Sequence, residues 1–455
     1  MPTRTPEAEP AVIERLARAL TFRTVSSRID EPDVRDAYTA LLDFLSHSFP
    51  ELYATARVEQ DEPWRLVIEL PGSDPSLDPI VLMAHYDVVD VAGGSEGEWT
   101  HAPWAGEIAD GFVWGRGALD DKNVLMALLE AAERVVRAGT GLARGLVLAF
   151  GGDEELAGRR GAAVTAARWS DAGRRFHFVL DEGAVIAVGM LAQPKTPVAL
   201  IGVEEKGHVN VRLRAHQEGG HAAMPPRHTA LGRLAAAVVR AEENPFPRRL
   251  TYSVGEFLRA LAPHVAVPLR TVYAHPRLFW PLIRRVLAAR PTSEALIRST
   301  QAATMANASA APNVLPQNAE AVFNVRILPG ESVASVVEHY RALLGGFGVA
   351  VDVPDLEDAH DPVAGTSVSH AGYELISRTA RELAECVPAP YLVTGSTDSK
   401  WYAPLADAVY RFLPMALDEN EISRIHGTDE RLSLENYSRL ITFYERIILG
   451  ACTNG

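Results

Sequence analysis

Three short and almost wholly apolar runs, each followed at once by ionisable side chains, constrain the fold of this 455-residue chain more than any other feature. They are residues 80–84, leading into His85-Tyr86-Asp87, residues 146–150, leading into Gly151-Gly152-Asp153-Glu154-Glu155, and residues 178–180, leading into Asp181-Glu182-Gly183. Continuous apolar runs are typical of strands buried on both faces of a largely parallel sheet. A helical apolar stripe over residues 121–139 separates the first two runs. This order predicts an α/β fold, a mainly parallel sheet with helices on both faces.

The pattern changes near Pro197. Residues 199–215 and 321–328 alternate between apolar and polar side chains, as strands of a half-solvated antiparallel sheet do, and helical patterns lie between them. We therefore expect an inserted α+β sandwich within a discontinuous large domain. The expected bounds are 1–197 and 365–455 for the large domain and 198–364 for the insert.

Within the insert, residues 252–299 are additional material, rich in Leu, Pro and Arg. We expect additional helices that pack around a small core of their own. The alternative is an apolar wall for a fatty substrate or a contact in an oligomer.

Charge and cysteine content exclude several functions. Lys and Arg number 44 against 58 Asp and Glu, a net charge of −14, which argues against nucleic-acid binding and against docking on anionic membranes. Two cysteines form neither a disulfide framework nor a thiolate zinc site. The opening MPTRTPEAEP lacks the layout of a signal peptide, and no run of about 18 apolar residues occurs. We predict a cytoplasmic protein without nucleic-acid or membrane partners.

Each polar motif has a structural as well as a chemical explanation. His85 and Asp87 face the same side of a strand, so the carboxylate can hold one ring nitrogen while the other binds a metal, although His-x-Asp also arises by chance. The turn GRGALDDK ends in Asp120-Asp121 at a helix start, where capping alone favours acids. Burying the acids at 153–155 at the end of a strand costs free energy unless a cation binds them or solvent reaches them.

Together the motifs favour a metal centre. Ligands of open α/β sheets gather at the carboxyl ends of the strands, so these acids converge on one edge and repel one another unless cations bind there. Carboxylates with imidazoles suit zinc or a similar divalent ion. Two zinc ions bring a charge of +4, which three carboxylates and one hydroxide would neutralise, so we favour two ions over one.

The motifs GRGALDDK, GGDEE, DEG and His426-Gly427-x-Asp429-Glu430, in this order, resemble those of the dinuclear zinc metallopeptidases that include aminoacylase, acetylornithine deacetylase, succinyl-diaminopimelate desuccinylase and carboxypeptidases G and S. The resemblance covers nearly the whole chain. Because of the long apolar insert, it is greatest for the branch of carboxypeptidase S and the N-fatty-acyl-amino-acid hydrolases.

The resemblance implies two zinc ions per chain, with cobalt or manganese as substitutes. Asp120 would bridge the ions, and the peptide bond after it would be cis. His85 and Asp181 would complete one site, and Glu155 and His426 the other. Glu154 would be the general base for metal-activated water, and Asp87 would orient His85.

The resemblance also implies residues for the substrate. His221, in Gly-Gly-His-Ala-Ala, would reach an active site across a homodimer and stabilise the oxyanion; the alternative is a turn histidine. Arg326 and Asn313 would hold a substrate carboxylate, although Arg326 could also form a surface ion pair. Gly395 and Ser396 lie in a loop that would contact substrate.

The predicted function is therefore hydrolysis of the amide bond in peptides or N-acyl amino acids that carry a free α-carboxylate. A dipeptidase or a short-chain N-acyl-amino-acid deacylase fits the motifs about equally well. Two remote alternatives remain. One is a serine hydrolase, because residues 93–97 match G-x-S-x-G around Ser95, although no helix start follows. The other is a catalytically silent metal-binding scaffold.

Overall fold

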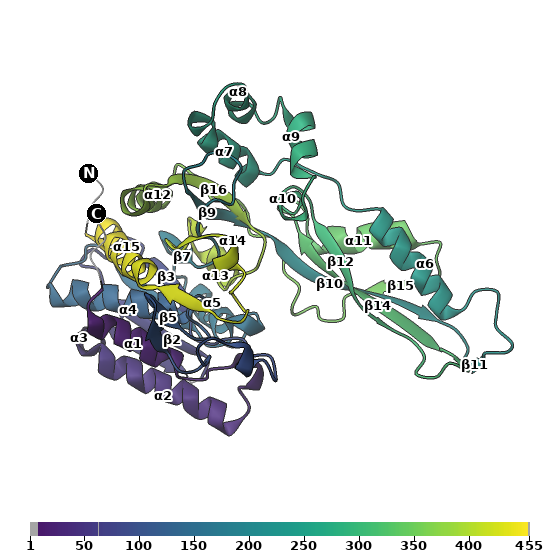
Figure 1. The fold of residues 1–455 in the computed structure, drawn as a ribbon, viewed down its shortest axis with the longest axis horizontal. Helices are drawn as coiled ribbons and strands as arrows, with labels where there is room; N and C mark the ends of the chain where they lie inside the picture. The colour runs from purple at the N-terminus through teal and green to yellow at the C-terminus, as the bar shows by residue number, and fades with distance from the viewer. Residues whose placement is uncertain (1–7, 62, 454–455) are drawn as a thin grey trace.

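A ten-stranded sheet forms the body of the protein, which we describe from a computed structural model for residues 8–61 and 63–453 (Figure 1). Its strand order is β1-β2-β6-β3-β7-β17-β9-β8-β18, with β16 paired to β9. Three central strands, β6 (Leu146–Gly151), β3 (Ile80–His85) and β7 (Phe178–Asp181), run parallel. They are the three apolar runs of the sequence, so the predicted α/β fold is confirmed.

The remaining strands of this large sheet complete it on both sides of the central three. They are β1 (Arg57–Asp61), β2 (Arg65–Leu70), β8 (Ile186–Ala187), β9 (Val198–Glu205), β16 (Val387–Val393), β17 (Val409–Arg411) and β18 (Ala416–Leu417). A separate three-stranded sheet contains β4 (Glu107–Ala109), β5 (Phe112–Trp114) and β19 (Arg431–Ser433).

Helices cover both faces of the large sheet because alternate residues of its strands face opposite cores. In β3, Ile80 and Leu82 join the larger core with the helices on one face, whereas Val81 and Met83 pack toward Trp169 on the other face. The larger core includes α1 (Pro10–Leu20), α2 (Pro32–Ser48), α3 (Pro50–Thr55), α4 (Lys122–Arg137), α12 (Ala371–Ala384) and α15 (Leu434–Cys452), and the smaller one α5 (Ala162–Asp171) and the segment after α13 (Ser399–Tyr402).

A second, antiparallel sheet extends away from the first (Figure 1). It consists of β12 (Thr300–Asn307), β14 (Asn318–Ile327), β10 (Gly207–His216) and β15 (Ala350–Asp352). Two helices, α6 (Ala230–Glu243) and α11 (Val333–Leu344), pack on it through one core. The short pair β11 (Gly220–His221) and β13 (Val314–Leu315) lies at its far end.

The strand β9 lies in the large sheet, although it falls within residues 198–364, the expected insert. It is buried in the large sheet, parallel to β16, and only β10 belongs to the small sheet. The alternation over residues 199–215 suggested a half-solvated strand, but the acids that end β9 are buried, with Glu205 paired to Arg411. The chain leaves the large sheet at Gly207, where a β-carbon would lie 2.5 Å from the carbonyl oxygen of His360.

The segment 252–299 is helical and has its own small core, as predicted. Its helices are α7 (Tyr252–Leu261), α8 (Leu269–Ala274), α9 (Trp280–Leu287) and α10 (Pro291–Glu294). Their core contains Val254, Leu258, Ile283 and Ile297. Leu261 packs on Val198 of β9 and Val387 of β16, so the segment rests on the large sheet instead of the small one.

Short helical turns and one further helix complete the described chain. The 3-10 turns are η1 (Ser26–Arg28), η2 (Glu96–Glu98), η3 (Glu154–Leu156), η4 (Ala262–His264) and η5 (Ala403–Leu405), and the helix is α14 (Glu419–Ile422). Every helix within the described ranges is too short or too polar to cross a lipid bilayer. Residues 1–7, where the sequence was judged to lack a signal peptide, lie outside the described residues.

Candidate metal centre and substrate cavity

The carboxyl ends of the central strands meet the turn that begins α4 and the loop after α14. The register pairs His85 at the end of β3 with Gly151 at the end of β6, just before the acids at 153–155. The peptide bond Asp120–Asp121 in the turn is cis, as the resemblance implies. Segments that are far apart in sequence thus bring their ionisable side chains to one place.

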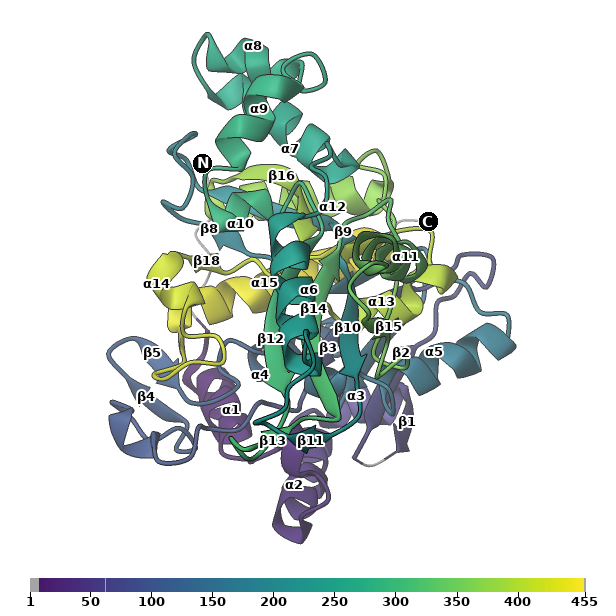
Figure 2. The same cartoon turned by 90° about the vertical axis from the view of Figure 1, so that its right-hand side faces the viewer.

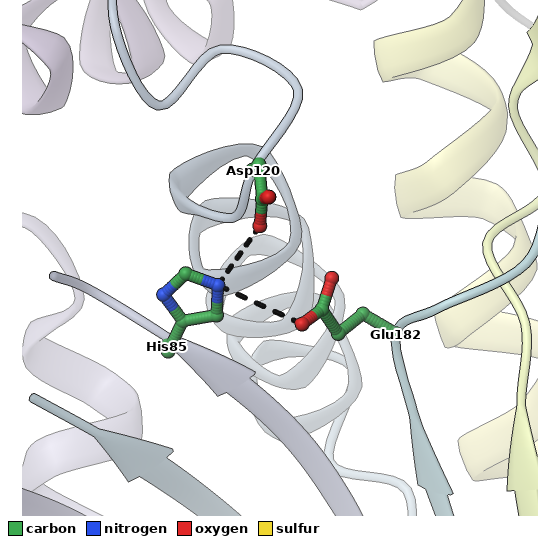
Figure 3. A group of neighbouring side chains, drawn as sticks. All are labelled: His85, Asp120 and Glu182. Carbon is green, nitrogen blue, oxygen red and sulfur yellow. Dashed lines mark hydrogen bonds and ion pairs between the residues drawn. The ribbon is translucent and has the colours of Figure 1, made fainter. Parts of the chain in front are cut away.

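One group of possible metal ligands surrounds His85 (Figure 3). Its Nε2 atom lies 2.9 Å from Oδ1 of Asp120 and 3.7 Å from Oε1 of Glu182. The three side chains come from the end of β3, the turn before α4 and the segment after β7. They can offer one nitrogen and two carboxylate oxygens to a single ion.

A second group surrounds His426 and shares Asp120 with the first. Nε2 of His426 lies 2.9 Å from Oδ2 of Asp120 and 3.0 Å from Oε1 of Glu155. The two oxygens of Asp120 therefore face different histidines. A carboxylate placed in this way can bridge two ions.

The structure corrects one expected ligand. Glu182, and not Asp181, lies beside His85 and Asp120. The carboxylate of Asp181 accepts hydrogen bonds from the backbone N–H groups of Glu182, at 2.9 Å, and Ser399, at 2.8 Å. Asp181 thus fixes the turn after β7, and that turn presents Glu182 to the centre.

Asp87 occupies the place expected of a residue that orients His85. Its Oδ1 lies 3.3 Å from Nδ1 of His85, and the ring nitrogen that faces Asp120 is the other one. The same carboxylate accepts the backbone N–H groups of Glu154 and Glu155, each at 3.1 Å. One buried side chain therefore connects two motifs of the centre.

A buried ion pair supports the turn that carries Asp120. Arg116 lies 2.6 Å from Glu430, and both side chains are almost fully buried. Oε1 of Glu430 accepts the backbone N–H of Leu119 at 2.7 Å and that of Asp120 at 3.3 Å. Because Arg116 also donates to the carbonyl oxygen of His426, the pair joins two of the three segments that supply the second group.

The electrostatics of the centre show what keeps so many acids together. Burial raises the pKa of Glu154 and Glu182 well above the ordinary range of a carboxyl. Burial also opposes a charge on His85, but hydrogen bonds to the neighbouring carboxylates raise its pKa well above the usual value. Hydrogen bonds to Asp120 and Glu155 raise the pKa of His426 to about 10. Protons therefore compensate the negative charge where no cation is bound.

These residues fit a pair of divalent cations. The donors are imidazole nitrogens and carboxylate oxygens, which suit zinc and related ions. The groups retain protons that metal binding would displace, as in known metal sites. The carboxylates of Asp120, Glu155 and Glu182 face the two positions. Their number is three whether Glu182 or Asp181 is the ligand, so the charge that two divalent ions would neutralise is the one expected from the sequence.

A cavity of about 730 Å³ opens beside the centre and reaches the small sheet. Asp120, Glu154, Glu155, Glu182 and His426 line it. The expected substrate residues Arg326, Gly395 and Ser396 line it too. None of the lining residues comes from the segment 252–299, so that segment does not form an apolar wall around this cavity.

Arg326 faces the cavity from β14 without forming an ion pair to any described acidic side chain. Burial lowers its pKa, since the guanidinium is partly removed from water. His208 is its cross-strand neighbour, and His360 lies next to His208, with 6.3 Å between ring centroids. Ser396 hydrogen bonds to His360 at 3.1 Å. These groups make a polar end to the cavity, and among them Arg326 carries the positive charge.

Two expected residues lie elsewhere. His221 is on β11 and Asn313 is in the adjacent loop, and the carbonyl oxygen of Asn313 accepts the N–H of Ala222. Both are exposed at the far end of the small sheet and neither lines the cavity of its own chain (Figure 1). The structure brings them together, but away from the metal centre.

Four residues of the site have no role predicted from the sequence: Glu182, Glu430, His208 and His360. The first two are part of the DEG and HG-x-DE motifs, so the signal was present but the roles were not assigned. His208 and His360 lie where the chain crosses between the two sheets, on segments joined by hydrogen bonds. No local motif distinguishes them.

The serine-hydrolase alternative lacks its structural basis. Ser95 lies in a loop after β3, followed only by the turn η2, instead of on an elbow between a strand and a helix. Its hydroxyl donates to the carbonyl oxygen of Ala92 at 2.7 Å.

Comparison with known proteins agrees with this geometry. The sequence pattern of peptidase family M20/M25/M40 matches residues 81–450. The chain belongs to this peptidase family. It is accordingly an enzyme of the metallopeptidase and amidohydrolase type, which removes the silent scaffold as an alternative.

The similar proteins confirm the predicted branch. A probable carboxypeptidase S-like 2 of Dictyostelium discoideum is 35% identical, over 96% of this chain and 84% of that protein. The N-fatty-acyl-amino acid synthase/hydrolase PM20D1 of Homo sapiens is 34% identical, over 98% and 89%. Carboxypeptidase S of Saccharomyces cerevisiae is 27% identical, over 96% and 83%.

Solved structures share the fold over the whole chain. The M20 family metallo-carboxypeptidase Sso-CP2 of Sulfolobus solfataricus superposes with a TM-score of 0.70 at 16% identity, covering 97% of this chain and 99% of that one. Human carnosine dipeptidase 1 gives a TM-score of 0.64 at 14% identity, covering 98% and 99%.

Proposed function

We propose that the protein hydrolyses the amide bond of N-acyl amino acids or peptides that carry a free α-carboxylate, using two divalent cations, with zinc as the first candidate and cobalt or manganese as substitutes. One observation carries the proposal: two ligand groups that share Asp120 open into the same cavity as Arg326. The similarity to proteins named carboxypeptidase S and N-fatty-acyl-amino acid hydrolase supports the substrate class.

The proposed ligands are His85, Asp120 and Glu182 for one ion and Asp120, Glu155 and His426 for the other. When bound, such ions supply Lewis acidity toward the amide carbonyl and lower the pKa of water. Glu154 accepts a proton from the attacking water and returns it to the leaving amine nitrogen, so that an acid and a free amine result. Its buried position on the cavity wall suits both transfers, because burial keeps its pKa high.

Arg326 provides the specificity for a carboxylate. A guanidinium forms two parallel hydrogen bonds with a carboxylate, and this one forms no ion pair with a described acidic side chain, although the charge of Glu205 acts on it from further away. Ser396 and the backbone of Gly395 lie on the same wall and would contact the rest of the substrate. A dipeptide and an N-acyl amino acid both present the required amide and carboxylate, so both remain candidates.

A substrate panel tests the proposal. Long-chain and short-chain N-acyl amino acids and dipeptides are compared, each as the free acid and as the carboxamide, with chelator controls. We expect kcat/KM to favour the acid by about 10- to 100-fold, since a hydrogen bond to a charged group contributes about 1.5–3 kcal/mol. Arg326→Met should remove this preference. Equal kcat/KM for acid and carboxamide in the wild type would refute recognition through Arg326.

A homodimer is part of the proposal, because His221 and Asn313 lie outside the cavity of their own chain. The outer face of α6 supports it, since Leu231 and Val239 are exposed there at a spacing of eight residues. In such a dimer His221 would stabilise the oxyanion in the other subunit, and Asn313 would help to hold the substrate there. The cytoplasmic location stays a prediction.

A further inference from the structure

The segment between α7 and β12 contains a surface with an unusual composition. Six arginines and no lysine or acidic residue occur between Glu256 and Glu294, in a chain with a net charge of −14. They are Arg259, Arg270, Arg277, Arg284, Arg285 and Arg290. We call residues 262–290, which include α8 and α9, the basic projection, because α8 and α9 stand out at the top of both views (Figures 1 and 2).

The basic projection also exposes large aliphatic side chains. Leu278 is 74% exposed, Leu282 52% and Val286 64%, and Val267, in the turn before α8, is 72% exposed. Leu282 and Val286 are four residues apart, so they lie along one flank of α9, and Leu278 precedes Leu282 by the same spacing. Contiguous exposed apolar side chains mark interaction sites more often than single ones do.

The exposed apolar flank is not the side of α9 that packs in the fold, because α9 has another, buried face. Ile283 is buried against Val254, Leu258 and Ile297, and Phe279, Trp280 and Leu287 pack partly against the same core. The exposed flank is therefore additional to what the helix needs for its own packing. Arg284 and Arg285 lie on the remaining part of its circumference.

The arginines of α9 and its flanks are available for an external partner. Arg277, Arg284, Arg285 and Arg290 are exposed, and no described acidic side chain forms an ion pair with any of them. Salt screens charges over about 8–10 Å at physiological ionic strength, so an approaching surface meets these cations and not the net charge of the whole chain. The expectation of no membrane partner rested on that net charge.

We propose that the basic projection docks on the surface of an anionic phospholipid bilayer. An arginine-rich polar face beside exposed Leu and Val side chains is the pattern of helices that lie in the membrane interface. The arginines near such a surface are attracted to its anionic headgroups, and the exposed aliphatic side chains enter the boundary between headgroups and acyl chains. A bilayer accepts a protruding tip without a matching groove, which a protein partner would have to supply.

Vesicle co-sedimentation of the full chain tests this proposal independently of the catalytic function. Vesicles of phosphatidylcholine alone are compared with vesicles that contain about 30% phosphatidylserine. We expect binding to the anionic vesicles to be at least tenfold stronger, and to weaken when salt rises from about 0.05 M to about 0.3 M.

Two variants with matched controls locate the surface. Leu282→Ser with Val286→Ser, and Arg277→Gln with Arg284→Gln and Arg285→Gln, should each lower the partition coefficient tenfold or more. The controls remove equivalent exposed side chains elsewhere: Ile108→Ser with Val188→Ser, and Arg240→Gln with Arg341→Gln and Arg378→Gln. Their binding should match that of the wild type.

Several results would overturn the proposal. These are equal binding to both kinds of vesicle, no binding to either, and equal losses in variants and controls. A fourth is an oligomer in solution that Leu282→Ser with Val286→Ser converts to a smaller species, because the occupant of the surface would then be a second copy of the chain.

Discussion

Oδ1 of Asp87 lies 3.3 Å from Nδ1 of His85, on the side of the ring opposite the one that faces Asp120 and Glu182. The backbone carbonyl oxygen of Asp87 also lies 3.0 Å from this Nδ1, and the two contacts together leave Nε2 to face a metal. Because the same carboxylate accepts the N–H groups of Glu154 and Glu155, it also fixes the loop that carries the proposed base. Asp87 therefore contacts both parts of the centre and is not among the residues that line the cavity.

Asp87→Asn tests this positioning. An asparagine side chain has one acceptor oxygen instead of two, so it cannot make all the contacts that Asp87 makes to the N–H groups of Glu154 and Glu155 and to His85. We therefore expect the affinity for the ion beside His85 to fall by about 10- to 100-fold. Competition with a chelator measures this affinity. Asp90→Asn, an exposed change three residues further on, is the control and should bind metal like the wild type. Unchanged affinity in Asp87→Asn would remove this role.

A second pair of variants distinguishes the ligand expected from sequence from the one that the structure indicates. Glu182→Gln should reduce the tightly bound metal from two ions per chain to one, whereas Asp181→Asn should retain two. The reason is that only Glu182 faces His85 and Asp120, while Asp181 accepts backbone N–H groups. Metal analysis after dialysis measures the number of ions per chain. Loss of an ion in Asp181→Asn but not in Glu182→Gln would show that Asp181 is the ligand.

The error over Asp181 shows where sequence reasoning ends. The apolar run at 178–180 predicted a buried strand and its polar end correctly, because burial on both faces leaves a continuous apolar signature. Which of two adjacent acids turns toward the centre depends on the backbone after the strand. That backbone is held by the N–H of Ser399, which is more than 200 residues away. No local pattern contains this information.

Strand β9 shows a related limit. The alternating pattern that contains Glu204 and Glu205 suggested a half-solvated strand, but both acids are buried. Glu204 accepts the N–H of Ser253, and Glu205 pairs with Arg411. Their partners come from the helical segment and from β17. Buried charges that are satisfied by distant residues look like surface charges in the sequence. The convergence of His85, Asp120 and the acids at 153–155 on one edge of the sheet could be predicted, because they lie at strand ends or at a helix start. The roles of Glu155 and His426 as ligands followed only from the resemblance to the metallopeptidase family.

Glu154→Gln tests the general base. The glutamine keeps the size of the side chain but cannot accept the proton of the attacking water, so kcat should fall by about 10²- to 10⁴-fold. Both ions should stay bound, because Glu154 belongs to neither ligand group. Steady-state kinetics and metal analysis of the same preparation check the two statements. Turnover equal to that of the wild type would exclude Glu154 from proton transfer.

The stability of the fold should depend on pH through His208. Burial, and the nearby Arg326, lower the pKa of His208 to about 4, below the value of about 6.5 that the unfolded chain has. The unfolded state therefore binds more protons than the folded state between these values, and the free energy of unfolding falls as pH drops from about 6.5 to about 4.

Denaturant unfolding of the metal-free protein across this range measures the effect. His208→Gln should show a smaller loss of stability on acidification than the wild type, because it lacks the proton that the unfolded histidine gains. His228→Gln, at an exposed position, serves as the control and should follow the wild-type curve. Parallel curves for His208→Gln and the wild type would contradict the role of His208.

The position of His221 at the far end of the small sheet leads to a complementation experiment. If the active site of one subunit takes its oxyanion donor from the other, His221→Ala and Glu154→Gln should each be nearly inactive as pure homodimers. In a mixed dimer, the subunit that carries His221→Ala still has Glu154 and receives an intact His221 from the other subunit. Equal random mixing should therefore restore about a quarter of wild-type kcat, because half of the dimers are mixed and each has one complete site. Mixing after reversible dissociation, with each unmixed variant as the control, measures the recovery, and no recovery despite mixed dimers would show that His221 does not act across the interface.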